Sequence, residues 1–340
     1  MLTEISLTEA RLQQILDDIS KVRICVVGDI CLDVYWFADM QRSRLSRETP
    51  HHPLPVVRET YGPGACGNVI HNIAALKPRA LLPVSMVSRD WRGYLLLQWM
   101  EEHGIDTSGI LRRDAGLTPC YCKPMRMGIS DVVYEDPRLD FENFDPISPE
   151  EEATLLTLMD RAAAQADLIA VSDQYRWGVL TPALRSRLTE LAQTMPVIVD
   201  SRERVSAYTG VIVKPNELEA AEAVGLDITK KNPSNEEFAQ IGRRLRQKNG
   251  SPVIVTLGSR GALWCDETGE ILAPTVEAKP PVDIVGAGDT FLSAFSCAYA
   301  TGASGGESLA FANLASGVTV KKIGTTGTAS RNEILQKYRE

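Results

Sequence analysis

Apolar and polar positions along the chain follow two alternating periods. Short, nearly continuous apolar runs predict buried parallel strands at 21–29, 80–87, 168–173, 196–200, 211–213 and 252–257. Helical spacing predicts helices at 6–19, 91–103, 149–165, 181–193 and 234–248, helices that open at 214–219 and at Asp289, and a last apolar helix at 307–320. These strand–helix units predict an α/β fold with a central mainly parallel sheet and helices on both faces.

Two segments depart from this alternation. Residues 34–61 and 118–134 contain prolines, arginines and short β-prone runs. We interpret them as one small β lid, since lids exclude water from a reactive site; two unrelated surface hairpins are the alternative. The predicted organisation is an N-terminal helical extension at 1–20 and one large domain at 21–340 that includes the lid. The extension either docks at an interface or joins the core.

Composition narrows the function classes. The chain has 340 residues, of which 44% are hydrophobic, and a formal net charge of −8. This charge argues against nucleic acid or an anionic membrane surface as the main partner. No apolar stretch approaches the ~20 residues of a membrane span, and no signal core precedes the first helix, so we expect a cytoplasmic protein. The 7 scattered cysteines are typical of small buried residues in a reducing compartment.

The segment with the clearest chemistry is Asp283-Ile-Val-Gly-Ala-Gly-Asp289-Thr290. Its glycines leave backbone N–H groups open at the start of a helix, where anions bind. Asp289 then stands in the first turn as a proton acceptor beside an anion pocket, which suits phosphoryl transfer. The alternative is an ordinary glycine turn with an acidic first turn.

Polar residues follow several of the predicted strands. They are Asp29, Asp173, Asp200, Asn216, Thr256 and Asp289. Because ligands bind at the carboxyl ends of parallel strands, these side chains are expected to line one crevice. Asp29 and the nearby Asp33 are candidates for binding neighbouring hydroxyls of a sugar; a helix cap and a solvated acid are the alternative.

A second glycine pattern suggests a different ligand. Gly62, Gly64 and Gly67 satisfy GxGxxG before a helical run, and Asp90 lies at the distance of a ribose-binding acid, which would fit a nicotinamide-dependent oxidoreductase. The first strand of the fold has already passed at 24–27, however. A glycine turn that brings Asn68 and bare backbone to a sugar fits this position better.

Five motifs together resemble a known family. GDICLD, GPGACGN, KPNELE, TLGSRGA and DIVGAGDT occur in the order found in ribokinase-like (PfkB-type) carbohydrate kinases, over about 21–328. Segments such as SRLSRETP, PRLDFEN and DSRERVSAY resemble the heptose 7-phosphate kinases of this family. The resemblance implies a ribokinase-like three-layer fold with a small β lid, and an ATP-dependent kinase acting on a sugar or sugar phosphate. It also implies Mg²⁺ and K⁺. Because a β lid with exposed edges often pairs with another lid, we also expect a homodimer formed through the lid.

The resemblance assigns roles to individual residues. Asp289 would be the general base, and the N–H groups of Gly286, Ala287 and Gly288 the anion hole. Sugar hydroxyls would be bound by Asp29, Asp33, Gly64 and Asn68. Arg44, Arg138 and Arg202 are candidates for holding a phosphate already on the sugar, because guanidinium groups bind phosphate through two bonds. A solvated surface position is the alternative for each arginine.

The remaining roles concern the nucleotide and the metals. The resemblance implies nucleotide binding by Asn216, Glu219, Thr256, Gly258, Gly261 and Asn313, with Glu219 acting on Mg²⁺ through water. It implies a monovalent-cation site, mostly of main-chain carbonyls, at Asp283, Val285, Thr319, Lys322, Gly324 and Thr328.

The chain also departs from the family pattern. Pro63 interrupts the usual paired glycine, and Lys214 replaces a more common Thr or Asn before Pro215. The unusual glycine loop motivates a second function hypothesis, a sugar- or nucleotide-binding regulator on the same fold without turnover.

Overall fold

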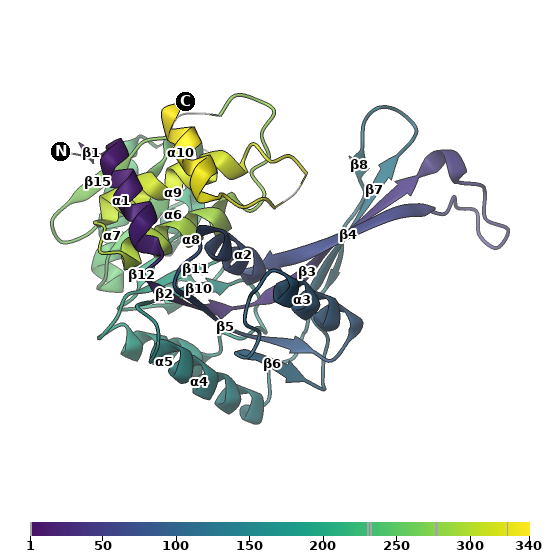
Figure 1. The fold of residues 1–340 in the computed structure, drawn as a ribbon, viewed down its shortest axis with the longest axis horizontal. Helices are drawn as coiled ribbons and strands as arrows, with labels where there is room; N and C mark the ends of the chain where they lie inside the picture. Colours follow the sequence, from purple (N-terminus) through teal and green to yellow (C-terminus); the bar gives the residue numbers. More distant parts are fainter. Residues whose placement is uncertain (1, 230, 232, 276–277, 325) are drawn as a thin grey trace.

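The computed structural model describes residues 2–229, 231, 233–275, 278–324 and 326–340. Its main sheet has 10 strands, and Figure 1 shows this sheet inside the helical body. In spatial order the strands are β1 (Thr3–Glu4), β15 (Glu270–Ala273), β14 (Ala262–Cys265), β13 (Val253–Thr256), β12 (Ile212–Val213), β11 (Val197–Ser201), β10 (Leu168–Asp173), β2 (Arg23–Gly28), β5 (Ala80–Ser88) and β6 (Ile110–Arg113).

The strand pairing is mainly parallel, as the sequence predicted. Among the described strands of this sheet, antiparallel pairing occurs where β14 meets β13 and β15. The central strands are apolar because both faces are covered: every residue of β10 is buried, and Ile24 to Val27 of β2 are inaccessible to solvent.

Helices cover the sheet on both faces, in three layers. The described helices are α1 (Glu9–Ile19), α2 (Cys66–Leu76), α3 (Trp91–Glu102), α4 (Pro149–Ala163), α5 (Pro182–Leu191), α6 (Glu217–Ala223), α7 (Asn235–Asn249), α8 (Ala287–Ala300), α9 (Gly305–Thr319) and α10 (Arg331–Arg339). One apolar core joins the sheet to α1, α2, α3, α8, α9 and α10. A second core joins its other face to α4, α5, α6 and α7.

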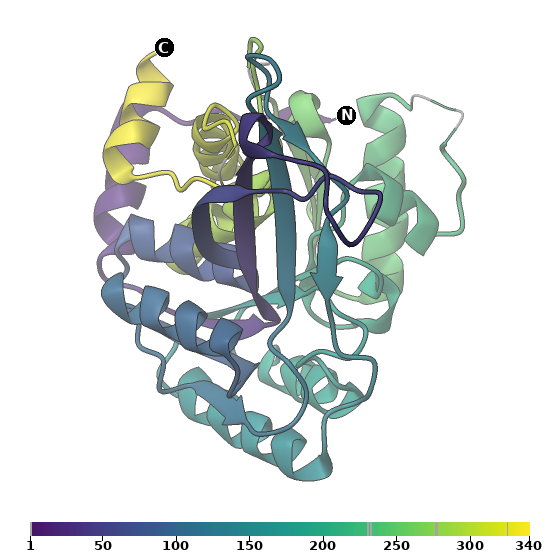
Figure 2. The ribbon, with the colours of Figure 1, turned by 90° about the vertical axis from the view of Figure 1, so that its right-hand side faces the viewer.

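A second sheet extends from this layered body (Figures 1 and 2). It has 5 strands, namely β3 (Ile30–Asp39), β4 (Val56–Ala65), β7 (Cys120–Met127), β8 (Tyr134–Glu135) and β9 (Leu139–Phe141). β3 pairs antiparallel with β4 and parallel with β7 over 8 residues of register, from Leu32 to Asp39. β3 leaves the body directly after β2, since only Asp29 separates the two strands.

The sequence analysis did not predict α10, β1 or β6, and it left the placement of the N-terminal helix open. The helix predicted as the last is followed by α10, a polar helix with only Ile334 buried, so apolar periodicity does not reveal it; its signal is the capping box of Ser330 and Glu333. Strands β1 and β6, of 2 and 4 residues, are too short for a periodic pattern. The N-terminal helix belongs to the core, because Leu12, Ile15, Leu16 and Ile19 are buried.

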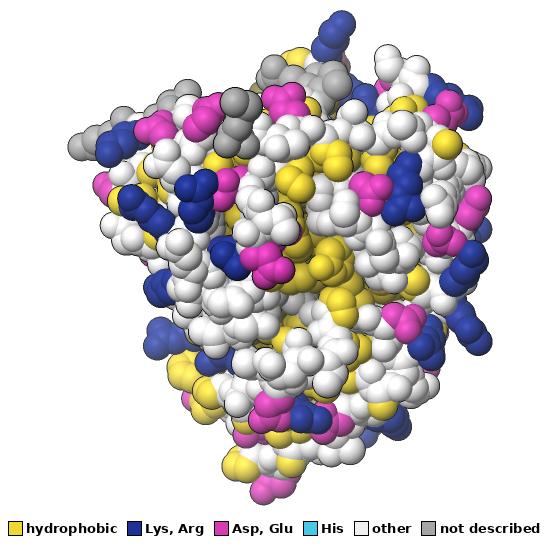
Figure 3. Space-filling view, turned by 90° about the vertical axis from the view of Figure 1, so that its left-hand side faces the viewer, with side chains coloured by type: hydrophobic (Ala, Val, Ile, Leu, Met, Phe, Trp, Pro, Cys, Tyr) yellow, Lys and Arg dark blue, Asp and Glu magenta, His cyan; other side chains and the backbone are white. Residues whose placement is uncertain are grey.

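Apolar side chains also reach the surface. Figure 3 shows the face that carries the N-terminus, where a band of them runs between charged groups. A groove of about 290 Å³, lined by Ile5, Leu7, Pro274, Leu314 and Tyr338 among others, lies between the two ends of the chain. Within the described residues, no helix has both the length and the apolar character that a membrane crossing requires.

Candidate active site

The largest of the described cavities is a cleft of about 790 Å³ at the start of α8. It lies beyond the carboxyl ends of β11, β12 and β13, where parallel sheets place their ligands. Every residue predicted to bind nucleotide lines this cleft, together with the glycine motif before α8: Asn216, Glu219, Thr256, Gly258, Gly261, Asn313, Gly286, Ala287 and Gly288.

The first turn of α8 leaves backbone donors open. Gly286 adopts the left-handed conformation with φ 77°, which glycine tolerates best, and no side chain caps the helix. The N–H of Ala287 bonds to the Ile284 carbonyl at 3.1 Å, so this predicted member of the anion hole is already engaged. Within the described residues the N–H groups of Gly288 and Asp289 have no partner. They and the helix dipole favour an anion here.

Asp289 stands where the cleft meets the second sheet. Its Oδ2 accepts a hydrogen bond from Asn68 Nδ2 at 3.3 Å. Burial, reinforced by the nearby Asp200 and Asp33, raises the pKa of Asp289 to about 7, although Asn68 and Lys214 oppose the shift. A carboxyl group with a pKa near neutrality accepts and releases protons readily, as a general base must.

Asp33, on β3, is a second carboxylate, and it lies close enough to Asp289 to raise the pKa of that residue. Its Oδ2 bonds to Lys123 Nζ at 3.1 Å, and this ammonium also donates to the Tyr35 hydroxyl at 2.9 Å. Gly64 lies directly against Asp33, since an added Cβ would stand 2.5 Å from Asp33 Oδ1. Sequence reasoning missed Lys123, because a single lysine in a β-prone run is an ordinary surface pattern.

Two buried polar atoms near this carboxylate are unpaired. Within the described residues, Asn68 Oδ1 and the Tyr175 hydroxyl have no hydrogen-bond partner. The Tyr175 ring lies 6.2 Å from that of Tyr121, next to Asp33's strand. Buried polar groups without partners are costly, so these atoms suit a ligand with hydroxyl groups.

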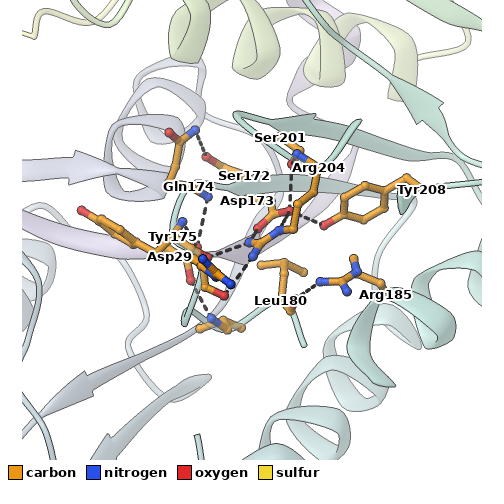
Figure 4. Close-up of polar contacts among 12 residues, drawn as sticks. Asp29, Ser172, Asp173, Gln174, Tyr175, Leu180, Arg185, Ser201, Arg204 and Tyr208 are labelled. Carbon is orange, nitrogen blue, oxygen red and sulfur yellow. Dashed lines mark hydrogen bonds and ion pairs between the residues drawn. The ribbon is translucent and has the colours of Figure 1, made fainter. Parts of the chain in front are cut away.

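The carboxylate of Asp29 is held by backbone N–H groups. Oδ2 accepts the N–H groups of Gln174 and Tyr175 at 3.1 and 2.9 Å, and Oδ1 accepts that of Val179 at 2.6 Å (Figure 4). These bonds fix the loop after β10. An ionised carboxylate has about four acceptor positions, so the binding of sugar hydroxyls by Asp29 stays a prediction.

Asp173 is also structural, contrary to the expectation that it lines the crevice. It is 1% exposed and accepts hydrogen bonds from Ser201 and Tyr208 at 2.8 and 2.9 Å. Arg204 forms a bidentate ion pair with the same carboxylate and donates a hydrogen bond to the Tyr175 carbonyl at 2.6 Å (Figure 4). Together these bonds connect the ends of β10 and β11 beneath the site.

The candidate phosphate-binding arginines lie in different places. Arg202 lines the cleft. Arg138 holds Asp140 through two bonds of 2.6 and 2.7 Å, and its guanidinium lies 4.1 Å from the centre of the Tyr121 ring. It is close enough to Asp33 to act on the pKa of that carboxyl group. Arg44 is exposed in the segment between β3 and β4, and the structure does not bring it to the cleft.

The residues predicted to act on magnesium form a helix cap. Asn216 Oδ1 accepts the N–H groups of Leu218 and Glu219, and Glu219 Oε2 accepts that of Asn216, each at 2.9 Å. Glu219 lines the cleft, and burial raises the pKa of its carboxyl group. One rigidly held carboxylate oxygen fits an outer-sphere role for Mg²⁺, which usually keeps several waters.

The predicted monovalent-cation site fits less well. Asp283 accepts the N–H groups of Val285 and Gly324 at 3.0 and 2.9 Å. The Thr328 carbonyl accepts Lys322 Nζ at 2.6 Å, and the Thr319 carbonyl accepts the Lys322 N–H at 2.9 Å. An ammonium group of this chain therefore already occupies one of the carbonyls expected to bind K⁺.

Lys214 and Asp200 form a further pair; sequence reasoning expected Asp200 in the crevice but did not assign Lys214 to the site. Lys214 Nζ lies 2.8 Å from Asp200 Oδ2, and both residues line the cleft.

The residues of the GxGxxG pattern lie elsewhere. Gly62 and Gly64 lie in β4, paired with β3, and Asp90 caps α3 through the Gly93 N–H. The dinucleotide interpretation has no support in this arrangement, because these glycines do not form the first strand-to-helix turn of the main sheet.

Comparison with known proteins gives one family. Residues 21–332 match the family model described as pfkB family carbohydrate kinase. The bifunctional protein HldE of Nitratiruptor sp. is 34% identical over 322 residues, and that of Geobacter sulfurreducens is 30% identical over 319 residues. These matches cover 94% and 92% of this chain, but only 65% and 62% of the relatives.

Solved structures agree on the fold. An Arabidopsis thaliana ribokinase complexed with ribose and ATP is 18% identical with a TM-score of 0.70, covering 94% of this chain and 99% of that one. Phosphofructokinase-2 from Escherichia coli, in complex with substrates and products, is 18% identical with a TM-score of 0.72 over the same shares. At this identity the likeness establishes the ribokinase-like fold alone, as the sequence predicted.

Proposed function

This chain belongs to the pfkB family of carbohydrate kinases, and from that premise we propose that it transfers the terminal phosphoryl group of ATP to a hydroxyl of a sugar phosphate. The best candidate for the acceptor is D-glycero-β-D-manno-heptose 7-phosphate. The identity of about one third to bifunctional HldE proteins, together with the segments that resemble heptose 7-phosphate kinases, supports this choice.

The observation that carries the proposal is the position of Asp289. It lies in the first turn of α8, beside two open backbone N–H groups, and within hydrogen-bonding distance of Asn68 at 3.3 Å. The cleft lies on one side, and Asp33 on the other side acts on its pKa. A proton acceptor between a nucleotide-sized cleft and a set of polar groups suits transfer of a phosphoryl group between two ligands.

In the proposed reaction Asp289 accepts the proton of the sugar hydroxyl as its oxygen attacks phosphorus. Asn68 orients this carboxylate, and Asp33 holds a second hydroxyl in place. The N–H groups of Gly288 and Asp289 stabilise the negative charge on the moving phosphoryl group, because they are fixed before the reaction begins. The second sheet limits the access of water, which would otherwise take the phosphoryl group.

We assign the nucleotide to the cleft, with its base near Asn313 and its phosphates toward Gly288. Magnesium, when bound with ATP, supplies positive charge to the phosphate oxygens, and Glu219 would hold its water shell. Potassium would bind at the loop of Asp283 and Gly324. Since Lys322 already donates to the Thr328 carbonyl at 2.6 Å, we expect a weak requirement for added potassium.

On the acceptor side, we assign the existing phosphate of the sugar to Arg138 or Arg202. Arg138 lies nearer Asp33, whereas Arg202 lines the cleft. We also propose a homodimer formed through the second sheet, because Val56, Val57 and Tyr134 of its strands are exposed apolar residues on strands that other chains can extend.

A product assay tests the proposed function. The purified chain is incubated with ATP, Mg²⁺ and K⁺ and, separately, heptose 7-phosphate, fructose, ribose or a nucleoside, and ADP and the phosphorylated product are measured by mass spectrometry. We expect turnover with heptose 7-phosphate and none with the Asp289→Asn variant. Turnover of another sugar would change the substrate, whereas tight binding of ATP and sugar without product would support the regulator hypothesis.

A further inference from the structure

A small pocket at the base of the second sheet has no part in the reaction proposed above. Its volume is about 20 Å³, and it shares no lining residue with the cleft. It lies at the inner end of the second sheet, since Ile30 begins β3 and Pro119 directly precedes β7. A cavity of roughly 10–15 Å³ holds one water molecule, so this pocket has room for a small polar group rather than for a whole sugar.

Arg113 is the buried cation of this pocket. It ends β6 and is 8% exposed. Its Nε donates to Ser88 Oγ at 3.3 Å, whereas no described residue accepts a hydrogen bond from its Nη1 or Nη2. Glu151 Oε2 is 3.9 Å from Nη1, too far for a hydrogen bond, and this oxygen already accepts the Ser148 N–H at 2.8 Å. Both outer nitrogens of the guanidinium group therefore keep open donors.

The loop beside Arg113 leaves space for the guanidinium group. Gly116 adopts φ 68°, and a Cβ at this position would overlap Arg113 Nη2. Asn143 holds the next residue of the loop, Leu117, by both backbone groups: its Oδ1 accepts the N–H at 3.0 Å, and its Nδ2 donates to the carbonyl at 2.8 Å. Asn143 and Leu117 line the same pocket, so its wall is fixed by hydrogen bonds.

The open donors specify the chemistry of a ligand. Buried donors without acceptors are costly, and a buried guanidinium group also needs a counter-charge. Asp29 lines the pocket too, but its carboxylate accepts hydrogen bonds from backbone N–H groups and not from Arg113. A phosphate group supplies negative charge and several acceptor oxygens, and guanidinium groups bind it through two parallel bonds.

Tyr175 connects this pocket with the side of the site that carries Asp33. It lines the pocket, and its hydroxyl has no hydrogen-bond partner among the described residues. Its ring lies 6.2 Å from that of Tyr121, which is opposite Asp33 in the register of β3 and β7. A sugar held at Asp33 would therefore reach Arg113 by passing Tyr175.

We propose that Arg113 binds a phosphate group in this pocket. Two sources share this chemistry: the phosphate that the acceptor sugar already carries, and free inorganic phosphate. The first source rests on the proposed kinase function, whereas the second does not. Arg113 suits the role better than Arg138, because Asp140 already occupies the guanidinium group of Arg138 with bonds of 2.6 and 2.7 Å.

The competing explanation is a structural arginine that only balances Glu151 at the start of α4. A structural arginine contributes to the free energy of unfolding, but it does not distinguish a phosphorylated ligand from the same ligand without phosphate. The two explanations therefore differ in ligand selectivity, which binding and kinetic measurements report separately from stability.

Calorimetry with sodium phosphate tests the free anion, at constant ionic strength and with AMP-PNP and Mg²⁺ present to fill the cleft. We expect Arg113→Met to weaken phosphate binding at least about tenfold, and Arg113→Lys to recover part of the loss. Arg89→Met is the matched control and should leave phosphate binding unchanged. Arg89 is a neighbour of Arg113 through its backbone N–H, but its side chain is 61% exposed and pairs with Asp114.

Steady-state kinetics with heptose 7-phosphate, and with the same heptose without phosphate, test the acceptor as the source. Arg113→Met should raise the KM of heptose 7-phosphate about 10–100-fold, keep the KM of ATP within about threefold, and leave kcat/KM of the unphosphorylated heptose unchanged. Inorganic phosphate should then inhibit the wild type in competition with heptose 7-phosphate. Phosphate that binds together with the sugar, and depends on Arg113, would instead assign the pocket to free phosphate.

The proposal fails if both measurements are negative. Phosphate binding that does not depend on Arg113, together with equal effects of Arg113→Met on the two sugars, would make Arg113 a structural residue. A wild-type chain that turns over no sugar would count against the proposed function, whereas calorimetry with phosphate would still decide whether Arg113 binds the anion.

Two further variants separate folding from binding. If Arg113→Met does not fold, Arg113→Lys and Glu151→Gln replace it. A glutamine at this position retains the capping box of α4 and leaves Arg113 without its nearest carboxylate, so phosphate binding should persist or strengthen. Loss of phosphate binding in Glu151→Gln would assign Arg113 to a structural ion pair.

Discussion

Two buried lysine–aspartate pairs act on Asp289. Asp33 and Lys123 belong to the second sheet, with nitrogen and oxygen 3.1 Å apart. Asp200 lies in β11 and Lys214 directly follows β12, at the carboxyl ends of central strands of the main sheet, with nitrogen and oxygen 2.8 Å apart. In both pairs the lysine side chain is less than a tenth exposed, at 9% and 5%. Both carboxylates raise the pKa of Asp289, so two pairs from different sheets act on one group.

The pairs differ in how fully their lysines are used. Lys123 donates to Asp33 and to Tyr35, and its neighbours are set by the parallel register of β3 with β7, which places Tyr35 opposite Lys123. Lys214 has Asp200 alone among the described residues and faces the cleft. The comparison teaches that a satisfied buried lysine fixes its surroundings, whereas an unsatisfied one is available to a ligand.

The largest loss of activity is expected when the carboxylate of Asp289, on which both pairs act, is removed. Asp289→Asn should lower kcat by about 10²–10⁴-fold while nucleotide still binds, because only proton transfer is lost. Steady-state kinetics and calorimetry with ADP measure the two quantities. Unchanged turnover would remove Asp289 from the chemistry, and the two pairs would then lose their common target.

Asp289→Asn should also change the free energy of unfolding, in a direction that depends on pH. The folded-state pKa of Asp289, about 7, lies above the value of the unfolded chain, ~3.9, so ionisation lowers the free energy of unfolding as the pH rises between these values. Asp289→Asn removes this penalty. Above pH 7 the variant should therefore melt at a higher temperature than the wild type, and near pH 4 the difference should vanish.

A smaller effect on activity is expected when the Asp33–Lys123 pair, here called the acceptor-side pair, is broken. Lys123→Met leaves Asp33 charged and less well oriented, so the KM of the sugar should rise about 10–100-fold while the KM of ATP stays within about threefold. Initial rates at varied sugar and ATP measure both. Arg204→Met is the matched control, because it breaks the buried ion pair with Asp173, and neither residue lines the cleft.

Both Lys123→Met and Arg204→Met should reduce the free energy of unfolding, by about 3 kcal/mol, since each leaves a buried carboxylate unpaired. Only Lys123→Met should alter the KM of the sugar. Equal effects of the two variants on this KM would mean that the acceptor-side pair acts through general stability rather than through substrate contact.

The smallest effect concerns the pH dependence of the wild type. Asp289 works as a base when it is deprotonated, so kcat/KM should rise with pH and level off above about 7, with about a tenfold loss one unit below the midpoint. A pH–rate profile measures this midpoint. A midpoint near 4 would show that neither pair shifts the base, and the comparison between them would fail.

The sequence predicted the parts of this molecule that depend on local pattern. The strand–helix alternation and the glycine motif before α8 follow from periodicity and from the backbone needs of a helix start. The lysine–aspartate pairs could not be predicted in this way. Asp33 and Lys123 are 90 residues apart in the chain and meet only when β3 pairs with β7. Local spacing carries no information about such a meeting.

Asp29 shows a second limit of local pattern. Its position after a strand has the pattern of a ligand-binding residue, yet its carboxylate is satisfied by backbone groups of Gln174, Tyr175 and Val179, about 150 residues away. A side chain at a strand end faces either the ligand or the adjoining loop, and only the packed structure distinguishes the two. Asn216 and Glu219 differ, because their capping box is a local pattern of two residues three positions apart.

The continuity of β3 has a mechanical consequence. The strand has 10 residues and so spans roughly 33 Å, with Asp33 near its inner end and Asp39 at its outer end. A stiff strand of this length acts as a lever, and its short arm carries Asp33, the residue that we propose binds the acceptor. A contact that tilts the outer end of β3, such as a contact with a second subunit, would therefore shift Asp33 relative to Asp289. Binding at the outer end of the second sheet would in this way change the alignment of the reacting atoms.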